Sequence, residues 1–537
     1  MTKTFILFII VFTLIGFENE AKSQAQNAVF QINNDTIWEQ DTLFVNNNIV
    51  IDTGVCLQIV PGKVVVFQGY YHILSYGKIT AIGIESDSII FIKTDLELLQ
   101  DSSTRKGGWN GIRLMPRSTA DTSVFRFCRF EGGKAVVPES PVFDESDENK
   151  GGLIYCKSCG NIIISNCTFN RSYAKRDGAG IYIYSANYVN LSHNHFSNNY
   201  SKFLGGAVFS YLVHNLYIEN NVFINNKAYS VTNMGGYLAI TGQGSALQVG
   251  NPINTLASCE IINNIFANNY SAFGTIVEGY RNSVLLGNLI CNNEGVSIFN
   301  AHSFNTPKYI NNTIMNNHND WYVAGMNILS PSVSVINNIV WHNYTEYPGD
   351  PQIFSKDDYD VDVSYSNIMY GFDGEGNINE VPMFVRPTIA VGDGYDGLDA
   401  DWSLLDESPC VNTGIADTSG LNLSPVDLWG NTRVFGGRIE MGAIENQNVL
   451  LYEEALVASP FQVYPNPGYD RLYIVVPVGF ENGTFELYDA KGICVLSKHV
   501  SSGPAVLYPA HVVAGMYFYR LMNQEKVIAS GKWIKTN

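Results

Sequence analysis

Three aspartates near the end of the repetitive part of the chain have the types and spacing of a cation-binding loop. Asp393, Asp396 and Asp399 alternate with glycines in the segment DGYDGLDAD. Spaced carboxylates in a glycine-containing loop are typical ligands of Ca²⁺, although this segment lacks the glutamate at the twelfth position of an EF-hand loop. We therefore predict Ca²⁺ as a candidate ligand of these three residues. No other cofactor motif is evident in the sequence.

Basic side chains and an imidazole offer a second kind of chemistry. In the run RSYAKRD, residues 171–177, three cations precede Asp177. The run could hold a sugar carboxylate, or it could be a solvated turn, and we favour the turn because charge runs usually face water. His195 is expected to be exposed, and without an identified partner it is a weak candidate for a general base. The sequence therefore assigns no catalytic residue.

Nine cysteines are spread over the chain rather than gathered into a dense disulfide framework. Cys156 and Cys159 form a C-x-x-C pair, which could be half of a redox or metal site. The sequence has no second pair of this kind. We therefore favour structural thiols or one local disulfide.

A six-residue block, Asn-x-apolar-x-Asn-Asn, repeats through the middle of the sequence, so the fold that positions these residues is repetitive. Successive copies begin 24 to 27 residues apart, with one interval of 43. The copies are CTFNRS at 167–172, NHFSNN at 194–199, NVFINN at 221–226, NIFANN at 264–269, NLICNN at 288–293, NTIMNN at 312–317 and NIVWHN at 338–343. The glycines Gly152, Gly180, Gly206 and Gly274 each lie 14 or 15 residues before the start of the next block, whereas Gly236 lies 28 residues before it. The long interval predicts an extra loop within 241–255.

This period, without helical hydrophobic spacing, predicts an all-β parallel β-helix in which three short strands and three turns make one coil. Period-two alternation puts the third block position, which is Phe, Ile or Val, inside the coil with positions one and five. We expect the asparagines at position five to form an internal ladder, because buried amides need hydrogen-bond partners. His342, which replaces one of them, is interpreted as a hydrogen-bonded substitute.

A sugar-cleaving site on such a helix needs carboxylates and a base on one face of neighbouring coils. The acids between 152 and 343 are Asp177, Glu219, Glu260, Glu278, Glu294 and Asp320. Counted from the nearest block or from the nearest glycine of the repeat, no two of these acids occupy the same position on adjacent coils. This weakens the interpretation as a lyase or hydrolase, although different columns could converge on one cleft.

Residues 36–130 are interpreted as earlier coils, and the acidic stretch 141–150 as an exposed loop that interrupts them. Motifs between 378 and 446 then close the repetitive region: PMFV at 382–385, DWSL at 401–404, SP at 408–409, GNTR at 430–433 and EMGAIE at 440–445. With them the segment resembles the closing part of a broad family of bacterial secreted right-handed β-helix proteins with the pectin lyase-like fold. Val381 and Glu440 depart from that pattern. The resemblance implies a cap over the last coil and says little about chemistry.

A second resemblance covers the C-terminus. Its motifs are VYPNP at 463–467, ELYD at 486–489, GMYF at 515–518 and KWIK at 532–535. With them residues 461–537 resemble the type IX (type A) C-terminal sorting domain of Bacteroidota, and their alternating runs suit a small antiparallel β-sandwich. The resemblance implies a partner in the type IX secretion machinery, passage through the periplasm and outer membrane, and removal of the domain on release or attachment.

The N-terminus has the features of a secretory signal peptide, with Lys3 before an apolar run at 4–17; a membrane anchor is the alternative. No other segment is a candidate span, so we expect no transmembrane segment in the mature chain. The expected organisation is a signal peptide at 1–25, N-terminal coils and the acidic loop at 26–150, the central helix at 151–377, the cap at 378–446, a linker at 447–460 and the sorting domain at 461–537.

The net charge of −18 argues against nucleic acid as a partner and disfavours acidic polysaccharide unless a cation mediates its binding. We predict a monomer, secreted or on the outer cell surface, that binds carbohydrate or acts in adhesion. The aromatic side chains that could stack on sugar rings are Tyr182, Tyr184, Tyr217, Trp321 and Trp341. The alternative is a polysaccharide lyase or glycoside hydrolase of the pectate-lyase-like type, with its cleft beside the extra loop.

Overall fold

The chain folds into two compact units that divide between Val449 and Leu450. The structure, a computed structural model, describes residues 29–141, 144–234, 237–251, 256–280, 282–300, 306–320, 323–346, 351–356, 359–448, 461–464, 466–468, 471–476, 480, 482–509, 511–523 and 526–536. The predicted signal peptide and Trp321 lie outside these residues. None of the helical segments in the described ranges has the length and hydrophobicity of a bilayer span.

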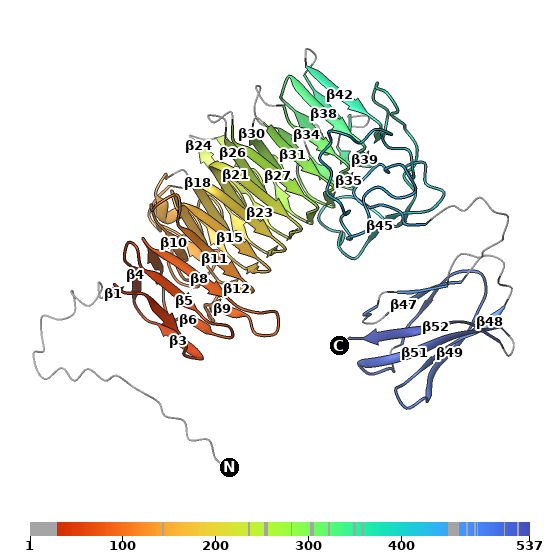
Figure 1. Cartoon of the computed structure of the whole chain (residues 1–537), viewed down its shortest axis with the longest axis horizontal. Helices are drawn as coiled ribbons and strands as arrows, with labels where there is room; N and C mark the ends of the chain where they lie inside the picture. Colours follow the sequence, from red (N-terminus) through yellow and green to blue (C-terminus); the bar gives the residue numbers. More distant parts are fainter. Residues whose placement is uncertain are drawn as a thin grey trace, which may run out of the picture. The chain divides into compact units, whose positions relative to one another are not determined.

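The first unit is a parallel β-helix with three faces, in which each strand pairs with the equivalent strand of the next coil (Figure 1). The first face contains β1 (Val29–Ile32), β4 (Asn48–Ile51), β7 (Ile73–Ser75), β10 (Ile112–Leu114), β14 (Ile154–Lys157), β18 (Ile181–Ser192), β21 (Val208–Glu219), β26 (Leu247–Asn251), β30 (Ile276–Tyr280), β33 (Ile298–Asn300), β37 (Met326–Ile328) and β41 (Ile353–Ser355). The second face contains β2 (Thr36–Trp38), β5 (Cys56–Ile59), β8 (Lys78–Ile82), β11 (Thr122–Arg126), β15 (Asn161–Ser165), the later parts of β18 and β21, β27 (Ser258–Ile262), β31 (Asn282–Leu286), β34 (Lys308–Ile310), β38 (Ser332–Ile336) and β42 (Asp360–Ser364).

The blocks of the repeat form the third face and the corner after it. The third face contains β3 (Thr42–Val45), β6 (Val64–Phe67), β9 (Ile89–Ile92), β12 (Cys128–Glu131), β16 (Thr168–Asn170), β19 (His195–Ser197), β22 (Val222–Ile224), β28 (Ile265–Ala267), β32 (Leu289–Cys291), β35 (Thr313–Met315), β39 (Ile339–Trp341) and β43 (Asn367–Ile368). The corner contains β13 (Lys134–Ala135), β17 (Tyr173–Ala174), β20 (Tyr200–Ser201), β23 (Lys227–Ala228), β29 (Tyr270–Ser271), β36 (His318–Asn319) and β40 (Tyr344–Thr345).

The third block position is inside the helix, as predicted. Phe169, Phe196, Phe223 and Phe266 are fully buried. Their rings stack from coil to coil with centroids 4.8–4.9 Å apart. This spacing is that of hydrogen-bonded neighbouring strands, so the strand repeat itself sets the ring stacking.

The internal asparagine ladder was predicted at the wrong position. Positions one and six of the block are buried and bonded between coils, for example Asn199 with Asn226. Position five instead has left-handed backbone angles, with φ of 57° at Asn198 and 57° at Asn268. That conformation breaks period-two alternation, and asparagine tolerates it better than most residues. His342 stands in this left-handed column, where its ring is hydrogen-bonded to Asn316 at 2.7 Å.

Most of the extra residues of the long interval form a hairpin, and they precede the predicted position. Strands β24 (Ser230–Met234) and β25 (Tyr237–Thr241) pair antiparallel, between β23 and the next strand of the first face. That next strand is β26, and its Leu247 pairs with Val208. Residues 247–251 are therefore an ordinary coil strand rather than a loop, and residues 252–255 lie outside the described residues. Gly206 donates its backbone N–H to the carbonyl of Gly244, so Gly244 occupies the glycine position of this coil, and Gly236 lies outside the described residues.

The closing segment (residues 378–446), which was predicted as a cap, runs back along the side of the helix. It includes β44 (Phe384–Arg386), which pairs antiparallel with β45 (Asp401–Leu404). The side chains of the left-handed column donate to its backbone, as Asn268 does to the carbonyls of Asp393 and Tyr395. Its Trp402 joins one buried cluster with Leu289 of the third face. Coils near the C-terminal end thus have a covered third face.

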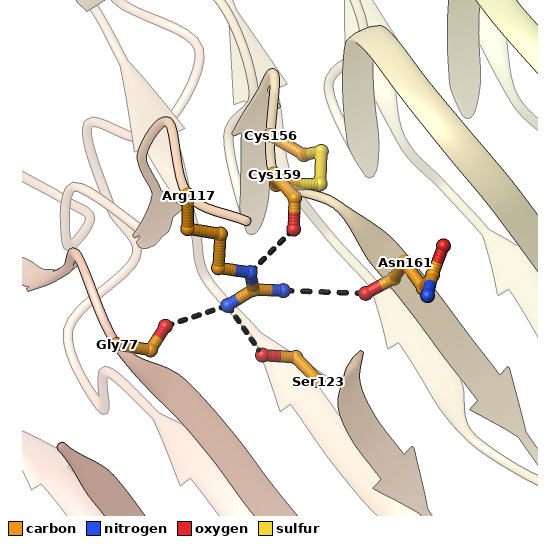
Figure 2. The surroundings of a disulfide bond; sticks show 6 residues. All are labelled: Gly77, Arg117, Ser123, Cys156, Cys159 and Asn161. Carbon is orange, nitrogen blue, oxygen red and sulfur yellow. Dashed lines mark hydrogen bonds between the residues drawn. A yellow bond between two sulfur atoms is a disulfide. The ribbon is translucent and has the colours of Figure 1, made fainter. Parts of the chain in front are cut away.

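Cys156 and Cys159 are joined by a disulfide, which is the second of the two predicted alternatives, structural thiols or one local bridge. Both residues are fully buried, at the turn between β14 and β15. Figure 2 shows Arg117 beside the bridge, where it donates to the carbonyl oxygen of Cys159. The same guanidinium also donates to the carbonyls of Gly77 and Asn161. The pair is therefore a structural element of the core.

The second unit consists of antiparallel sheets of three and four strands, as predicted for the C-terminus. Its strands are β46 (Gln462–Tyr464), β47 (Leu472–Val476), β48 (Gly483–Tyr488), β49 (Cys494–Val500), β50 (Gly503–Leu507), β51 (Gly515–Asn523) and β52 (Lys526–Lys535). Side chains of both sheets, among them Ile474 and Trp533, share one buried core. This arrangement is that of a small β-sandwich.

Candidate functional site

A groove of about 770 Å³ lies on the first face of the helix, near its N-terminal end. Most of its lining comes from β4, β7, β10 and β14 and from the turns beside them. The lining residues are Asn47, Asn48, Tyr70, Tyr71, His72, Leu74, Arg105, Asn110, Arg113, Met115, Asp147, Glu148 and Tyr155. Aromatic rings, an imidazole, two guanidinium groups and two carboxylates thus converge on one hollow.

Arg113 is the buried centre of this groove. Its guanidinium lies 4.2 Å from the ring centroid of Tyr155, the residue that pairs with it on the next coil. The same group donates to the side chain of Asn110 at 3.3 Å and to the carbonyl of Asp147 at 2.5 Å. Burial lowers the pKa of Arg113, and Tyr155 opposes that effect. A guanidinium nevertheless stays protonated at neutral pH, so the groove has a fixed positive centre.

The acidic stretch forms one wall of the groove. It was predicted as an exposed loop, but Asn149 and Lys150 are buried. A short 3-10 helix, η1 (Asp147–Asn149), carries two of its carboxylates, Asp147 and Glu148, and each of these two is paired with a cation. Asp147 lies 2.7 Å from Lys157, and the carboxylate of Glu148 lies 3.0 Å from Arg105.

The run at 171–177 holds this wall in place, so the prediction of a solvated turn is wrong for most of it. Lys175, Arg176 and Asp177 are buried, whereas Arg171 is exposed and paired with Glu131. Lys175 donates to the carbonyls at 137 and 138, at 2.7 and 3.0 Å, and Arg176 pairs with the carboxylate at 145. These bonds fasten the acidic stretch over the first face.

The neutral groups of the groove are suited to hydrogen bonding. Burial, with a smaller effect from Arg113, lowers the pKa of His72 to about 4, so its imidazole is neutral at physiological pH. Burial likewise raises the pKa of Tyr70 to about 12. A base with a pKa near 4 is poorly matched to proton abstraction at neutral pH. The His72 imidazole and the Tyr70 hydroxyl are therefore both neutral hydrogen-bonding groups of the groove.

An aromatic row continues from the groove along the first face. The rings of Tyr155 and Tyr182 stack at 5.3 Å, and those of Tyr182 and Phe209 at 4.9 Å. Tyr182, one of the predicted sugar-stacking residues, is buried in this row. Tyr184 is half-buried beside Tyr211, with ring centroids 6.1 Å apart.

The other predicted aromatic and histidine positions lie on different faces. Tyr217 is half-buried on the second face, 5.6 Å from Tyr188. Trp341 packs against the cluster under the closing segment. His195 is half-buried on the third face, where burial lowers its pKa. The structure thus does not bring these side chains to the groove.

The three aspartates of the predicted Ca²⁺ loop are exposed in the closing segment. Asp396 accepts a hydrogen bond from the backbone N–H of Leu398 at 3.0 Å, and Asp399 lies 3.8 Å from Arg386. Asp393 instead acts electrostatically on Glu294, a residue of a neighbouring coil. Ca²⁺ binding by the three residues stays a prediction.

Two sets of residues in the structure were not predicted from the sequence. Arg113 and Tyr155 gave no signal, because neither belongs to the asparagine repeat and a lone arginine or tyrosine suggests no chemistry. Glu294 and His318 did give one: each lies six residues after the start of its block, and the structure places them side by side. The comparison of positions in the sequence considered acidic residues alone, so it did not detect this pair of a carboxylate and an imidazole.

Comparison with known proteins agrees with both units. Residues 37–251 match the right handed beta helix region, and residues 462–536 match the secretion system C-terminal sorting domain. No curated protein matches the chain. The chain is a right-handed β-helix protein with a type IX sorting domain. A β-helix protein of this kind is secreted across the outer membrane, to the cell surface or the medium, and its sorting domain implies interaction with the type IX secretion machinery.

Proposed function

We propose that this secreted β-helix protein binds a polysaccharide outside the cell, in the groove around Arg113. The observation that carries the proposal is the stacking of the buried Arg113 guanidinium on Tyr155, 4.2 Å apart, at the centre of a 770 Å³ hollow. Sugar recognition requires polar groups at fixed positions next to flat apolar surfaces, and this hollow offers both.

The rim of the groove supports the same function. Arg105 lies 5.5 Å from the ring centroid of Tyr70 and 3.0 Å from the carboxylate of Glu148. Half of the Arg105 side-chain surface is exposed, so its outward N–H groups can reach a ligand. Planar guanidinium groups donate in a fixed geometry to hydroxyl or carboxylate oxygens, which is the chemistry a glycan presents.

Cleavage of the polysaccharide is the second candidate function, and the acids predicted for it do not gather in the groove. Glu278 is buried inside the helix, where it accepts hydrogen bonds from Ser283 and Tyr309, both at 2.8 Å. The carboxylates that do line the groove are Asp147 and Glu148, and both are held in ion pairs. One observation favours cleavage: two carboxylates and two arginines line the same groove.

A polysaccharide panel distinguishes these functions. The mature protein is run through native gels that contain each polysaccharide, with and without Ca²⁺, while absorbance at 235 nm and reducing ends are followed in solution. We expect retardation in at least one gel with no cleavage product. New absorbance at 235 nm would identify a lyase, reducing ends alone would identify a hydrolase, and no retardation by any polysaccharide would contradict the proposal.

A further inference from the structure

A second group of ionisable side chains lies on the corner of the helix, away from the groove. The residue that follows each block forms one column there, and β-bridges join Tyr270 to Glu294 and Glu294 to His318. His318 in turn pairs with Tyr344. The coil repeat therefore brings a carboxylate and an imidazole side by side, from residues 24 apart in sequence.

The distances within this group are those of potential metal ligands. His318 Nδ1 lies 2.7 Å from Glu294 Oε1, and His318 Nε2 lies 3.9 Å from Asp320 Oδ1. One nitrogen or oxygen atom from each of the three residues can be chosen so that all lie within 4.8 Å of one another. Within the described residues, this is the one set of three or more His, Cys, Asp or Glu side chains with that property.

The closing segment brings a third carboxylate toward the group. Gly392 donates its backbone N–H to the carbonyl of Asn316 at 2.9 Å, which holds the chain against this corner. A β-carbon built on Gly392 would lie 3.4 Å from Glu294 Oε2, so the segment passes in direct contact with that carboxylate. Asp393, the next residue, is one of the three predicted cation ligands.

Negatively charged groups outnumber positively charged ones at this corner of the helix. Glu294, Asp320 and Asp393 surround one imidazole, and Lys227 is the nearby cation that acts on Asp393. Carboxylate oxygens of Glu294 and Asp320 lie 2.7 and 3.9 Å from the two ring nitrogens of His318, so two negative charges are held close together. Such repulsion between carboxylates is what a bound divalent cation relieves.

We propose that Glu294, His318 and Asp320 bind a divalent transition-metal ion of the Zn²⁺ class, with the carboxylate of Asp393 adding to the negative charge of the site. An imidazole nitrogen combined with carboxylate oxygens is a ligand set for Zn²⁺ and its neighbours, whereas Ca²⁺ and Mg²⁺ take oxygen ligands. The ion joins two adjacent coils at the point where the closing segment crosses them.

Binding requires a rotation of Asp320, because its carboxylate now faces Nε2 of His318 whereas Glu294 lies at Nδ1, and one ion binds only one of the two ring nitrogens. Ligand atoms around a tetrahedral Zn²⁺ lie roughly 3.3 Å apart, given metal–ligand distances of about 2.0–2.1 Å. The Asp320 side chain is 66% exposed and can rotate toward the imidazole. Three protein ligands leave the fourth position of the ion to water.

The test is a titration of the chelator-treated mature protein with Zn²⁺, in competition with a chromophoric chelator, and a parallel titration with Co²⁺ followed by its visible absorption. We expect saturable binding of one ion per chain, with Co²⁺ bands typical of a nitrogen and oxygen ligand set. Glu294→Gln, His318→Gln and Asp320→Asn should each weaken Zn²⁺ binding at least about tenfold. Asp320 is exposed, so Asp320→Asn tests the site without disturbing the fold.

Two matched controls distinguish an ion held at this corner from an ion held elsewhere on the chain. His195→Gln removes a half-buried imidazole from another column, and Asp396→Asn removes a carboxylate of the predicted Ca²⁺ loop; both should leave the Zn²⁺ affinity unchanged. Absence of saturable Zn²⁺ and Co²⁺ binding would overturn the proposal, as would wild-type affinity in His318→Gln and Asp320→Asn. Equal competition by Ca²⁺ would also overturn it, because it would assign the ion to the wrong class.

Discussion

The side-chain oxygen of Asn226 accepts two hydrogen bonds from Asn199, one from its backbone N–H at 3.2 Å and one from its side-chain amide at 2.8 Å. Asn226 itself donates to the carbonyl of Phe196 at 2.9 Å and to the side chain of Asn269. Asn226 therefore bonds to buried groups on the coil before it and on the coil after it. The ladder is the element that makes a polar turn compatible with a solvent-free interior.

Replacing Asn226 by Ala should lower the free energy of unfolding by about 3 kcal/mol, because buried donors of Asn199 lose their acceptor. The matched control is Asn198→Gly in the left-handed column, where φ is 57° and glycine fits without strain. We expect that control to change the free energy of unfolding much less. Urea unfolding followed by circular dichroism measures both variants, and equal losses would contradict the assigned roles of the two columns.

The buried carboxyl of Asp177 should make stability fall as pH rises through the mildly acidic range. Burial raises its pKa to about 7, although Arg176 and Lys150 oppose the shift. Between pH 4 and 7 the unfolded chain has released this proton and the folded chain still holds it, so the folded state loses its advantage as pH rises.

Asp177→Asn should flatten this dependence and raise the free energy of unfolding at pH 8 by up to about 4 kcal/mol, since each pKa unit corresponds to about 1.4 kcal/mol. Thermal unfolding of both proteins from pH 4 to pH 8 measures the difference. Parallel stability curves would show that Asp177 does not titrate as assigned.

The disulfide between Cys156 and Cys159 should stabilise the helix modestly, because it closes a very short loop. A variant with both residues changed to Ser should unfold with about 2 kcal/mol less free energy. Since the two cysteines are joined and have no free thiol, thiol-reactive reagents should leave them unmodified in the native protein while labelling the free and exposed Cys494. Rapid reduction of the bridge in the native protein, detected by mass spectrometry, would contradict its burial.

The closing segment should be needed for stability because it covers apolar side chains of the third face. Trp402 is 1% exposed, and its indole N–H donates to the carbonyl of Gly397 at 2.9 Å. Trp402→Ala should cost about 3–5 kcal/mol in the free energy of unfolding. Trp429, which is 49% exposed in the same segment, is the matched control and should change stability by less than about 0.5 kcal/mol when replaced by Ala. A similar loss in both variants would contradict this packing.

The sequence predicted the helix well because its coil repeat and the inward Phe column follow from period and alternation alone. The prediction was wrong at position five because a residue with left-handed backbone angles, such as Asn198, changes the side of the strand to which its side chain points. Alternation of apolar residues with period two gives no information on such backbone angles. The part of the third face that the closing segment covers could have been detected in the sequence. Outward block positions change from polar in His195 to apolar in Ile265 and Leu289, as expected where another segment packs on them.

The groove could not be predicted in the same way. Arg113 and Tyr155 are neighbours because the strands β10 and β14 pair, and the acidic stretch that walls them in lies between these strands in sequence. Its folded position depends on Lys175 and Arg176 of the following coil. Such contacts between coils leave no periodic pattern in the sequence.

The measurement that most directly tests glycan binding in the groove compares two arginines with one polysaccharide that retards the wild-type protein. Arg105 pairs with Glu148 at the rim of the groove, and Arg171 pairs with Glu131 on the third face. Both are about half exposed, so Arg105→Gln and Arg171→Gln are matched in chemistry and in expected stability. We predict at least about tenfold weaker binding for Arg105→Gln, through loss of a charge-assisted contact, and wild-type binding for Arg171→Gln. Equal affinity of the two variants would contradict the groove as the binding site.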